Sequence, residues 1–114
     1  MNTTARKELQ VQYRSRETIG GVYVIKNRLK NKLYLDGSLD LWGSKNRFEF
    51  AVSTGSCVHP KLQDDWIEQN GSHFEFEVLD ELKKGETQTD AGFRADIEFM
   101  KQMWCEKLAG ETLY

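Results

Sequence analysis

The sequence predicts one small α/β domain of the α+β type, with helices flanking a three-stranded sheet in the order β-β-α-α-β-α. Three observations predict this fold. Two β-branched and aromatic runs lie on either side of a short polar segment at residues 27–31. Apolar and acidic residues alternate at residues 73–80, and a long helical pattern covers residues 90–110.

Length and composition fit one folded domain. The chain has 114 residues, of which 39% are hydrophobic and 11% aromatic, enough for one core. Residues 20–114 should form this domain, whereas residues 1–19 are rich in charge and predict a short helix or a loosely held arm. No apolar run resembles a signal peptide or a membrane span, so neither export nor a membrane partner is expected.

Charge and cysteine content narrow the function classes. The net charge is −2, so the field of the whole molecule does not attract nucleic acid, and phosphate binding needs a local basic patch. Cys57 and Cys105 lie far apart and in no metal-binding spacing. A disulfide framework and a zinc site are therefore not expected, and the predicted location is a reducing cytoplasm.

The first elements are a hairpin and two helices. Residues 22–25 and 32–35 are β-branched or aromatic, and the residues between them favour a turn. A helix is predicted within residues 38–52, and a second, short helix starts at Pro60. The residues expected on their apolar faces are Leu41, Phe48 and Val52, then Leu62, Trp66 and Ile67.

A third strand and a long helix complete the chain. Phe74, Phe76 and Val78 alternate with acidic residues, which is typical of a half-buried strand. The final helix has apolar residues at steps of four, three, four and four, with Asp90 and Gly110 near its ends. These apolar residues are Phe93, Ile97, Met100, Trp104 and Leu108.

Two tyrosines carry a resemblance to a known family. Gly21, Val22 and Tyr23 are followed eleven positions later by Tyr34, which begins the run Tyr-Leu-Asp-Gly. This pair of motifs resembles that of the GIY-YIG nuclease family. The order of elements also fits, and later blocks extend the likeness to the short stand-alone bacterial members, over roughly residues 20–108.

The resemblance implies a set of catalytic residues. In that family two tyrosines, an arginine of the first helix and a glutamate of the last helix cut a phosphodiester with one divalent metal. Tyr23 and Tyr34 match the tyrosines, and a tyrosine can orient or help deprotonate a water if its environment lowers its pKa. The arginine position holds Ser44, and the nearest arginine is Arg47. The alternative is that the tyrosines are packed strand residues and Arg47 is a solvated charge.

Several positions depart from the family pattern. The family's histidine falls on Phe48, and the glycine of its second motif falls on Asp36 unless the loop uses Gly37. The metal-binding glutamate falls on Lys101, whose ammonium would repel a divalent cation. Glu98, one turn earlier, is the remaining candidate ligand for magnesium, the cofactor expected if the domain is active. The alternative is that Glu98 is a solvated surface carboxylate.

The tip of the hairpin is a candidate nucleic-acid-binding patch. Four positive residues lie there within seven positions, enough to meet several phosphates. They are Lys26, Arg28, Lys30 and Lys32. The alternative is an ordinary solvated turn.

Two function hypotheses follow from these patterns. The first is a GIY-YIG-type domain that engages DNA, as a metal-dependent endonuclease of weak or lost activity. The second is a catalytically inactive module on the same fold that binds a protein partner. A salt-dependent affinity for DNA separates the two, because protein partners need not produce it. Nothing in the sequence indicates the oligomeric state.

Overall fold

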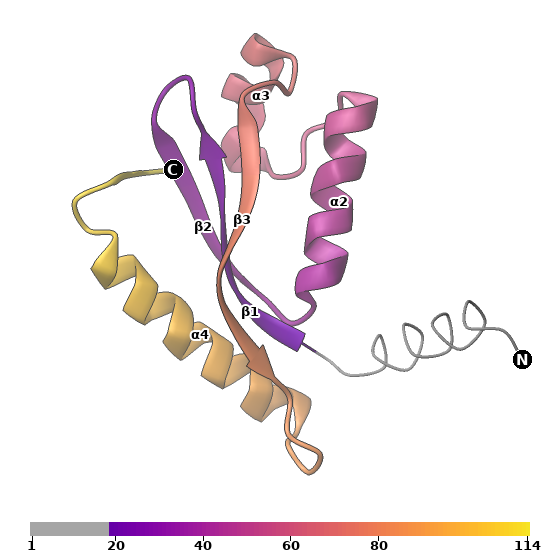
Figure 1. Ribbon diagram of the computed structural model, residues 1–114, viewed down its shortest axis with the longest axis vertical. Coiled ribbons are helices and arrows are strands. Elements are labelled where there is room, and N and C mark those ends of the chain that lie inside the picture. The colour runs from indigo at the N-terminus through magenta and orange to yellow at the C-terminus, as the bar shows by residue number, and fades with distance from the viewer. Residues whose placement is uncertain (1–18) are drawn as a thin grey trace, which may run out of the picture.

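A mixed sheet of four strands, in the order β3-β1-β2-β4, carries helices on both of its faces (Figure 1). The computed structural model describes residues 19–114, so the predicted arm at residues 1–19 lies outside the described residues except for its last position. The predicted class and the order β-β-α-α-β-α are confirmed, with a single 3-10 turn before the second helix.

The sheet has one strand more than predicted. Thr112–Leu113 forms β4, which pairs in parallel with the start of β2 (Lys32–Ser38). The backbone N–H of Tyr114 extends this pairing by donating to the carbonyl of Leu33 at 2.9 Å. A strand of two residues is too short for a periodic pattern, and its partner is distant in the sequence, so no local signal marks it.

The predicted hairpin joins β1 (Ile19–Asn27) to β2. Asn27 shapes the turn, because its side-chain carbonyl accepts hydrogen bonds from the backbone N–H groups of Leu29 and Lys30, each at 3.1 Å. Asn31 follows with a left-handed φ of 57°, a conformation that asparagine tolerates. The turn therefore depends on two asparagines at its start and end.

The register of the hairpin puts both tyrosines on one face of the sheet. Tyr23 lies opposite Asp36, and Ile25 lies opposite Tyr34. Opposite residues of an antiparallel pair point to the same face, and residues two apart on one strand do so as well. The tyrosines are therefore diagonal neighbours on adjacent antiparallel strands.

Two helices cover this tyrosine-bearing face. The first, α2 (Leu41–Thr54), begins after Asp40, whose carboxylate accepts a hydrogen bond from the backbone N–H of Gly43 at 3.1 Å. The second, α3 (Gln63–Gln69), follows the short 3-10 helix η1 (Pro60–Leu62). Both helices are held by the side chains that they bury against the sheet.

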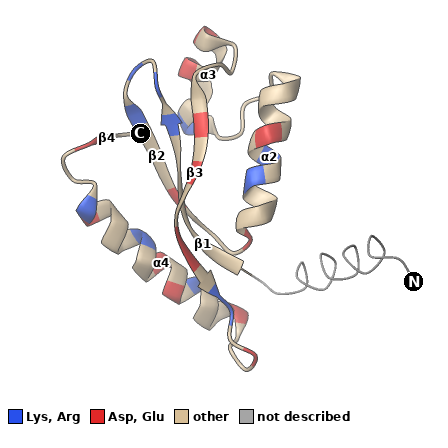
Figure 2. Cartoon of the chain, viewed as in Figure 1, with Lys and Arg blue, Asp and Glu red and all other residues tan. Residues whose placement is uncertain are grey.

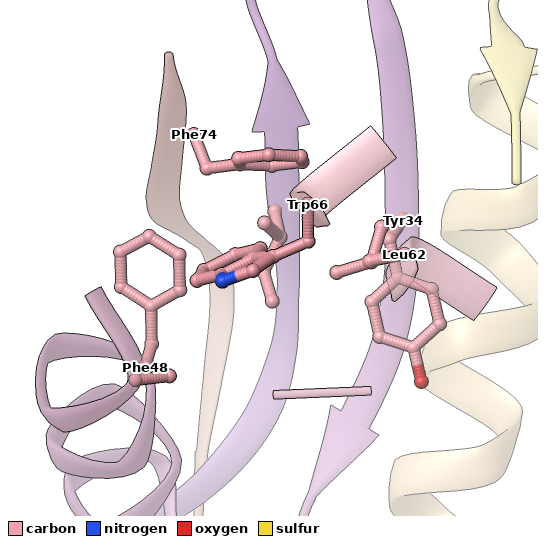
Figure 3. Close-up of a cluster of buried hydrophobic side chains, with 7 residues drawn as sticks. Tyr34, Phe48, Leu62, Trp66 and Phe74 are labelled. Atoms are coloured by element: carbon pink, nitrogen blue, oxygen red, sulfur yellow. The ribbon is translucent and has the colours of Figure 1, made fainter. Parts of the chain in front are cut away.

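The core between these helices and the sheet is aromatic. Trp66 is 1% exposed; it stacks on Phe74 with 4.6 Å between ring centroids and meets Phe48 edge-on at 6.1 Å. The ring of Tyr34 belongs to the same cluster, near Leu62, while its hydroxyl points away from Trp66 (Figure 3). The core thus fixes the tyrosine ring and leaves its oxygen at the cluster's border.

Two residues predicted on apolar helix faces are exposed. Val52 is 43% exposed and Ile67 is 66% exposed. In α2 the buried stripe reaches Ala51, and the next residue is turned about 100° away from it. In α3 only seven residues are helical, and Trp66 alone fills the space that the apolar pattern assigned to both side chains.

The other face of the sheet is covered by α4 (Asp90–Lys107), which follows β3 (Phe74–Lys83). Ile97 packs where two glycines leave room: a Cβ on Gly20 would lie 2.5 Å from its Cδ1, and a Cβ on Gly37 would lie 2.7 Å from its Cγ2. The close approach of α4 to the sheet therefore requires glycine at both positions. None of the helices in this part of the chain is long and apolar enough to cross a membrane.

The glycine contact yields a stability prediction. Gly20→Ala should lower the free energy of unfolding by about 1–3 kcal/mol, because the added Cβ would also lie 2.5 Å from the carbonyl oxygen of Ser38. Gly110→Ala is the control, since no heavy atom lies within 4 Å of the added Cβ there. Urea unfolding measures both, and equal stabilities for the two variants would contradict the close approach of α4.

Candidate functional site

Tyr23 and Tyr34 line one cleft, on the sheet face that α2 covers. Arg47 of α2 lines the same cleft, so the structure brings together the three residues predicted as catalytic. The cleft is small, about 160 Å³. The residues that line it are Tyr23, Ile25, Tyr34, Asp36, Ser44, Arg47, Val58 and His59.

Asp36 is the centre of a hydrogen-bonded group at the cleft. The Tyr34 hydroxyl donates to Asp36 Oδ2 at 2.8 Å, and the backbone N–H of Gly37 donates to Oδ1 at 2.8 Å. Lys101 Nζ lies 3.3 Å from the same Oδ1. Because α4 lies on the opposite face and β1 flanks the inner side of β2, the lysine reaches Asp36 past the outer edge of β2.

Lys101, and not Glu98, approaches the tyrosines. Lys101 follows Ile97 by four residues, about one helical turn, and Ile97 faces the sheet. Glu98 is exposed, does not line the cleft, and forms no ion pair with any residue of the part of the chain that the structure describes. The side chain proposed as a metal ligand therefore lies at the surface of α4.

Arg47 reaches back to the position that the resemblance assigns to the family's arginine. Its Nη2 donates to Ser44 Oγ at 3.1 Å, and Ser44 Oγ shares a hydrogen bond of 2.6 Å with Ser38 Oγ. Within residues 19–114 no carboxylate pairs with Arg47. Its remaining N–H donors can therefore meet an anion in the cleft.

His59 also lines the cleft, and no sequence pattern signals it. Its ring packs against that of Tyr34 with 4.6 Å between centroids. Its Nδ1 accepts the backbone N–H of Lys61 at 3.2 Å, which caps η1. The neutral imidazole therefore carries its proton on Nε2. His59 thus fixes the loop before η1 and forms one wall of the cleft.

Both tyrosine hydroxyls are protonated at neutral pH, and burial raises the pKa of each above its ordinary value. The pKa of Tyr23 is raised to about 12: desolvation is the main cause, the Asp36 charge adds to the rise and the Arg47 charge opposes it. Desolvation also raises the pKa of Tyr34, and its hydrogen bond to Asp36 adds to the effect. Neither Tyr23 nor Tyr34 therefore has the lowered pKa that help in deprotonating water requires. Both hydroxyls act as hydrogen-bond donors or acceptors in the neutral form.

The groups around the cleft do not fit a divalent cation. Magnesium prefers several oxygen ligands in an octahedral arrangement. Both oxygens of Asp36 already accept hydrogen bonds, and the ammonium of Lys101 lies next to one of them. Across residues 19–114 no group of three or more His, Cys, Asp or Glu side chains could hold a metal ion.

Positive side chains of the hairpin tip have negative partners on β3 and α3. Figure 2 shows the positions of both charges along the hairpin and these two elements. The ion pairs are Lys26 with Glu77 at 2.6 Å, Arg28 with Glu75 at 2.8 Å, and Lys30 with Asp65 at 2.6 Å and Glu68 at 3.0 Å. The fourth residue, Lys32, lies over the ring of Tyr114, 5.2 Å from its centroid. The tip therefore carries no excess of positive charge over the carboxylates that surround it.

Among the comparisons with known proteins, the one with solved structures gives matches. No protein-family profile matches the chain, and no curated protein matches it. The catalytic domain of the homing endonuclease I-TevI, a GIY-YIG enzyme, aligns with a TM-score of 0.55 and 26% identity, over 79% of this chain and 88% of that chain. The chain has the GIY-YIG fold. A mutant of the same I-TevI domain aligns with a TM-score of 0.56 and 25% identity, over 80% of this chain and 84% of the other.

The sequence pattern predicts the positions of some residues that line the cleft of this GIY-YIG fold, and it does not predict those of others. Asp36 stands two positions after Tyr34, so strand alternation signals that the two side chains share a face. Ser44 is a polar residue on the buried stripe of α2, which is a weaker signal. His59 enters the cleft through an irregular segment, and only the folded chain reveals it.

The raised pKa of Tyr23 predicts how stability depends on pH. The hydroxyl has a pKa of about 12 in the folded state, against the usual 10.0. Its contribution to the free energy of unfolding is therefore complete below pH 10 and is lost as the pH rises towards 12. Between pH 10 and pH 12 the free energy of unfolding should therefore fall less for Tyr23→Phe than for the wild type. Urea unfolding at a series of alkaline pH values measures the difference. Parallel curves for the two proteins would contradict the burial of this hydroxyl.

Proposed function

We propose that the cleft binds a phosphodiester of DNA, and that metal-dependent cleavage there is weak or absent. The observation that carries this proposal is the position of Lys101, whose ammonium lies 3.3 Å from Asp36 beside the hydroxyl of Tyr34. An ammonium there repels a divalent cation and neutralises Asp36, which leaves Arg47, unpaired within residues 19–114, to attract a phosphate. The GIY-YIG fold supports a DNA-acting role, since the I-TevI neighbours are endonuclease domains.

The chemistry of the cleft supports binding more than it supports hydrolysis. Arg47 can hold phosphate oxygens with two parallel N–H donors. The hydroxyl of Tyr23 is protonated at neutral pH and can donate to an oxygen as well. The ammonium of Lys101 balances the charge of Asp36, so the charge of Arg47 leaves the cleft net positive. Hydrolysis would also need a base for the attacking water, and neither tyrosine supplies one at neutral pH.

The hairpin tip is a weaker candidate for the phosphate contact. Each of Lys26, Arg28 and Lys30 would have to exchange a carboxylate partner for a phosphate, which reduces the net gain. Arg47 has no such partner within the described part of the chain. We therefore assign the main phosphate contact to the cleft and a secondary one to the tip.

A second candidate function is protein binding by the same fold without catalysis. The observation that favours it is on α4, where Phe99 and Met103 are 69% and 44% exposed and line a hollow with Trp104. Exposed apolar side chains grouped in this way are typical of protein interfaces. A partner held there would bind with little dependence on salt, in contrast to DNA in the cleft.

The binding proposal predicts different effects for the cleft and the tip. Arg47→Ala should weaken DNA affinity by about 1.5–3 kcal/mol, the range for a hydrogen bond to a charged group, and should reduce the salt slope by about one unit. Lys30→Ala should have a smaller effect on both, because Lys30 is already paired. Fluorescence anisotropy with labelled DNA at several salt concentrations measures them. The reverse order of effects would move the phosphate site to the tip.

The position of Lys101 predicts that one substitution creates a cation site. Lys101→Glu would place a second carboxylate beside Asp36, a pair that favours a divalent cation. Calorimetry should detect manganese binding to this variant and not to the wild type. Magnesium-dependent nicking of DNA should appear with it and be lost on Tyr34→Phe.

The control for this experiment is Arg94→Glu, the same change of charge at an exposed position of α4. It should create neither manganese binding nor nicking. Robust magnesium-dependent nicking by the wild type, lost on Glu98→Gln, would show instead that Glu98 is the metal ligand and that the cleft is active without any change.

A further inference from the structure

A second hollow adjoins the cleft on the outer side of α2. It lies between α2 and the segment that follows this helix, and it has a volume of about 490 Å³. Small-ligand sites commonly have roughly 300–1,000 Å³. Arg47 and Val58 line both this hollow and the cleft, so the two lie side by side and share these side chains as a common wall. A ligand with one group in the cleft can therefore extend a second group into the hollow.

The lining of the hollow combines an aromatic ring, an amide and apolar atoms. Phe50 is 66% exposed, so most of its surface is open to a ligand. Asn46 stands one helical turn before Phe50, and its amide both donates and accepts hydrogen bonds. Ala51, Cys57 and Val58 supply the apolar part of the lining. A flat ring with polar edges has surfaces that match all three.

We propose that this hollow holds an unpaired nucleobase, from the nucleotide next to the phosphate bound in the cleft. The base would stack on Phe50 and place its polar edge towards Asn46. This inference rests on the proposed function, because the cleft must hold the phosphate. A nucleotide carries an anionic phosphate and a flat aromatic base on one sugar, and the lining offers Arg47 to the phosphate and Phe50 to the base.

The occupant is a base of single-stranded or locally opened DNA. In a duplex each base is covered on both faces by its neighbours, so its face cannot reach a protein ring until it is unstacked. Stacking on an aromatic side chain accepts every base, because each has a π-face. We therefore expect a preference for single strands over duplex, with little preference for sequence.

The test compares three probes: a short oligothymidylate, an oligonucleotide of the same length with abasic sites, and a duplex. The abasic strand keeps the phosphates and lacks the bases. Fluorescence anisotropy should give the tightest binding for oligothymidylate. Phe50→Ala should weaken that binding by roughly 5- to 150-fold, the effect of removing one stacking platform, and should leave the abasic strand and the salt slope unchanged.

Two variants complete the experiment. Phe99→Ala is the matched control, because Phe99 is equally exposed, at 69% against 66%, but lies on α4 away from the hollow. Its affinity for oligothymidylate should equal that of the wild type. Phe50→Trp keeps an aromatic platform and should retain binding. Circular dichroism checks that all variants are folded, and the exposure of Phe50 predicts that they are.

The outcomes separate this inference from the proposed function. Unchanged oligothymidylate binding by Phe50→Ala, or an equal loss on the abasic strand, would overturn the base site. If Arg47→Ala still weakened binding to all three probes, the proposed phosphate site in the cleft would be supported although the base site had failed. If neither Arg47→Ala nor salt changed the affinity, the phosphate proposal would fail, and the base site with it.

Discussion

The contact of one side chain, Ile97, with two glycines determines where α4 lies on the sheet. Gly20 and Gly37 leave the space that Ile97 fills, and any larger residue at either position would push the helix outwards. Lys101 is one turn further along α4, so this contact also sets how far its ammonium extends towards Asp36. The composition of the cleft on one face of the sheet thus depends on packing on the other face.

Asp36 and Lys101 are best understood as a pair. The resemblance assigns a glycine to position 36 and a metal-binding glutamate to position 101. Each of the two differences, taken alone, only weakens the likeness to the family. In the structure the two side chains form an ion pair, and the aspartate also holds the Tyr34 hydroxyl. Relative to the pattern that the resemblance implies, the strand here carries the negative charge and the helix the positive one. Either residue without the other would leave an unpaired charge beside the buried Tyr34.

The sequence predicts the elements of this fold better than it predicts the site. The common face of Tyr23 and Tyr34 follows from strand alternation and a short turn, and the inward position of Ile97 follows from helical periodicity. The approach of Lys101 past the strand edge does not follow, because it depends on the distance between α4 and the sheet. The carboxylates at the hairpin tip and the ring of His59 come from segments distant in the sequence, and no local pattern places them.

The short length of β4 has a consequence for how this protein behaves at high concentration. β4 pairs only with Lys32 and Leu33, so the rest of the outer edge of β2 has no partner strand among residues 19–114. An unpaired edge can act as a template on which another molecule adds a strand and begins to aggregate. Lys101 pairs with Asp36 of this strand, and charged side chains beside a strand edge disfavour such an addition. The ion pair beside Tyr34 thus also bears on how the exposed edge of the sheet meets other molecules.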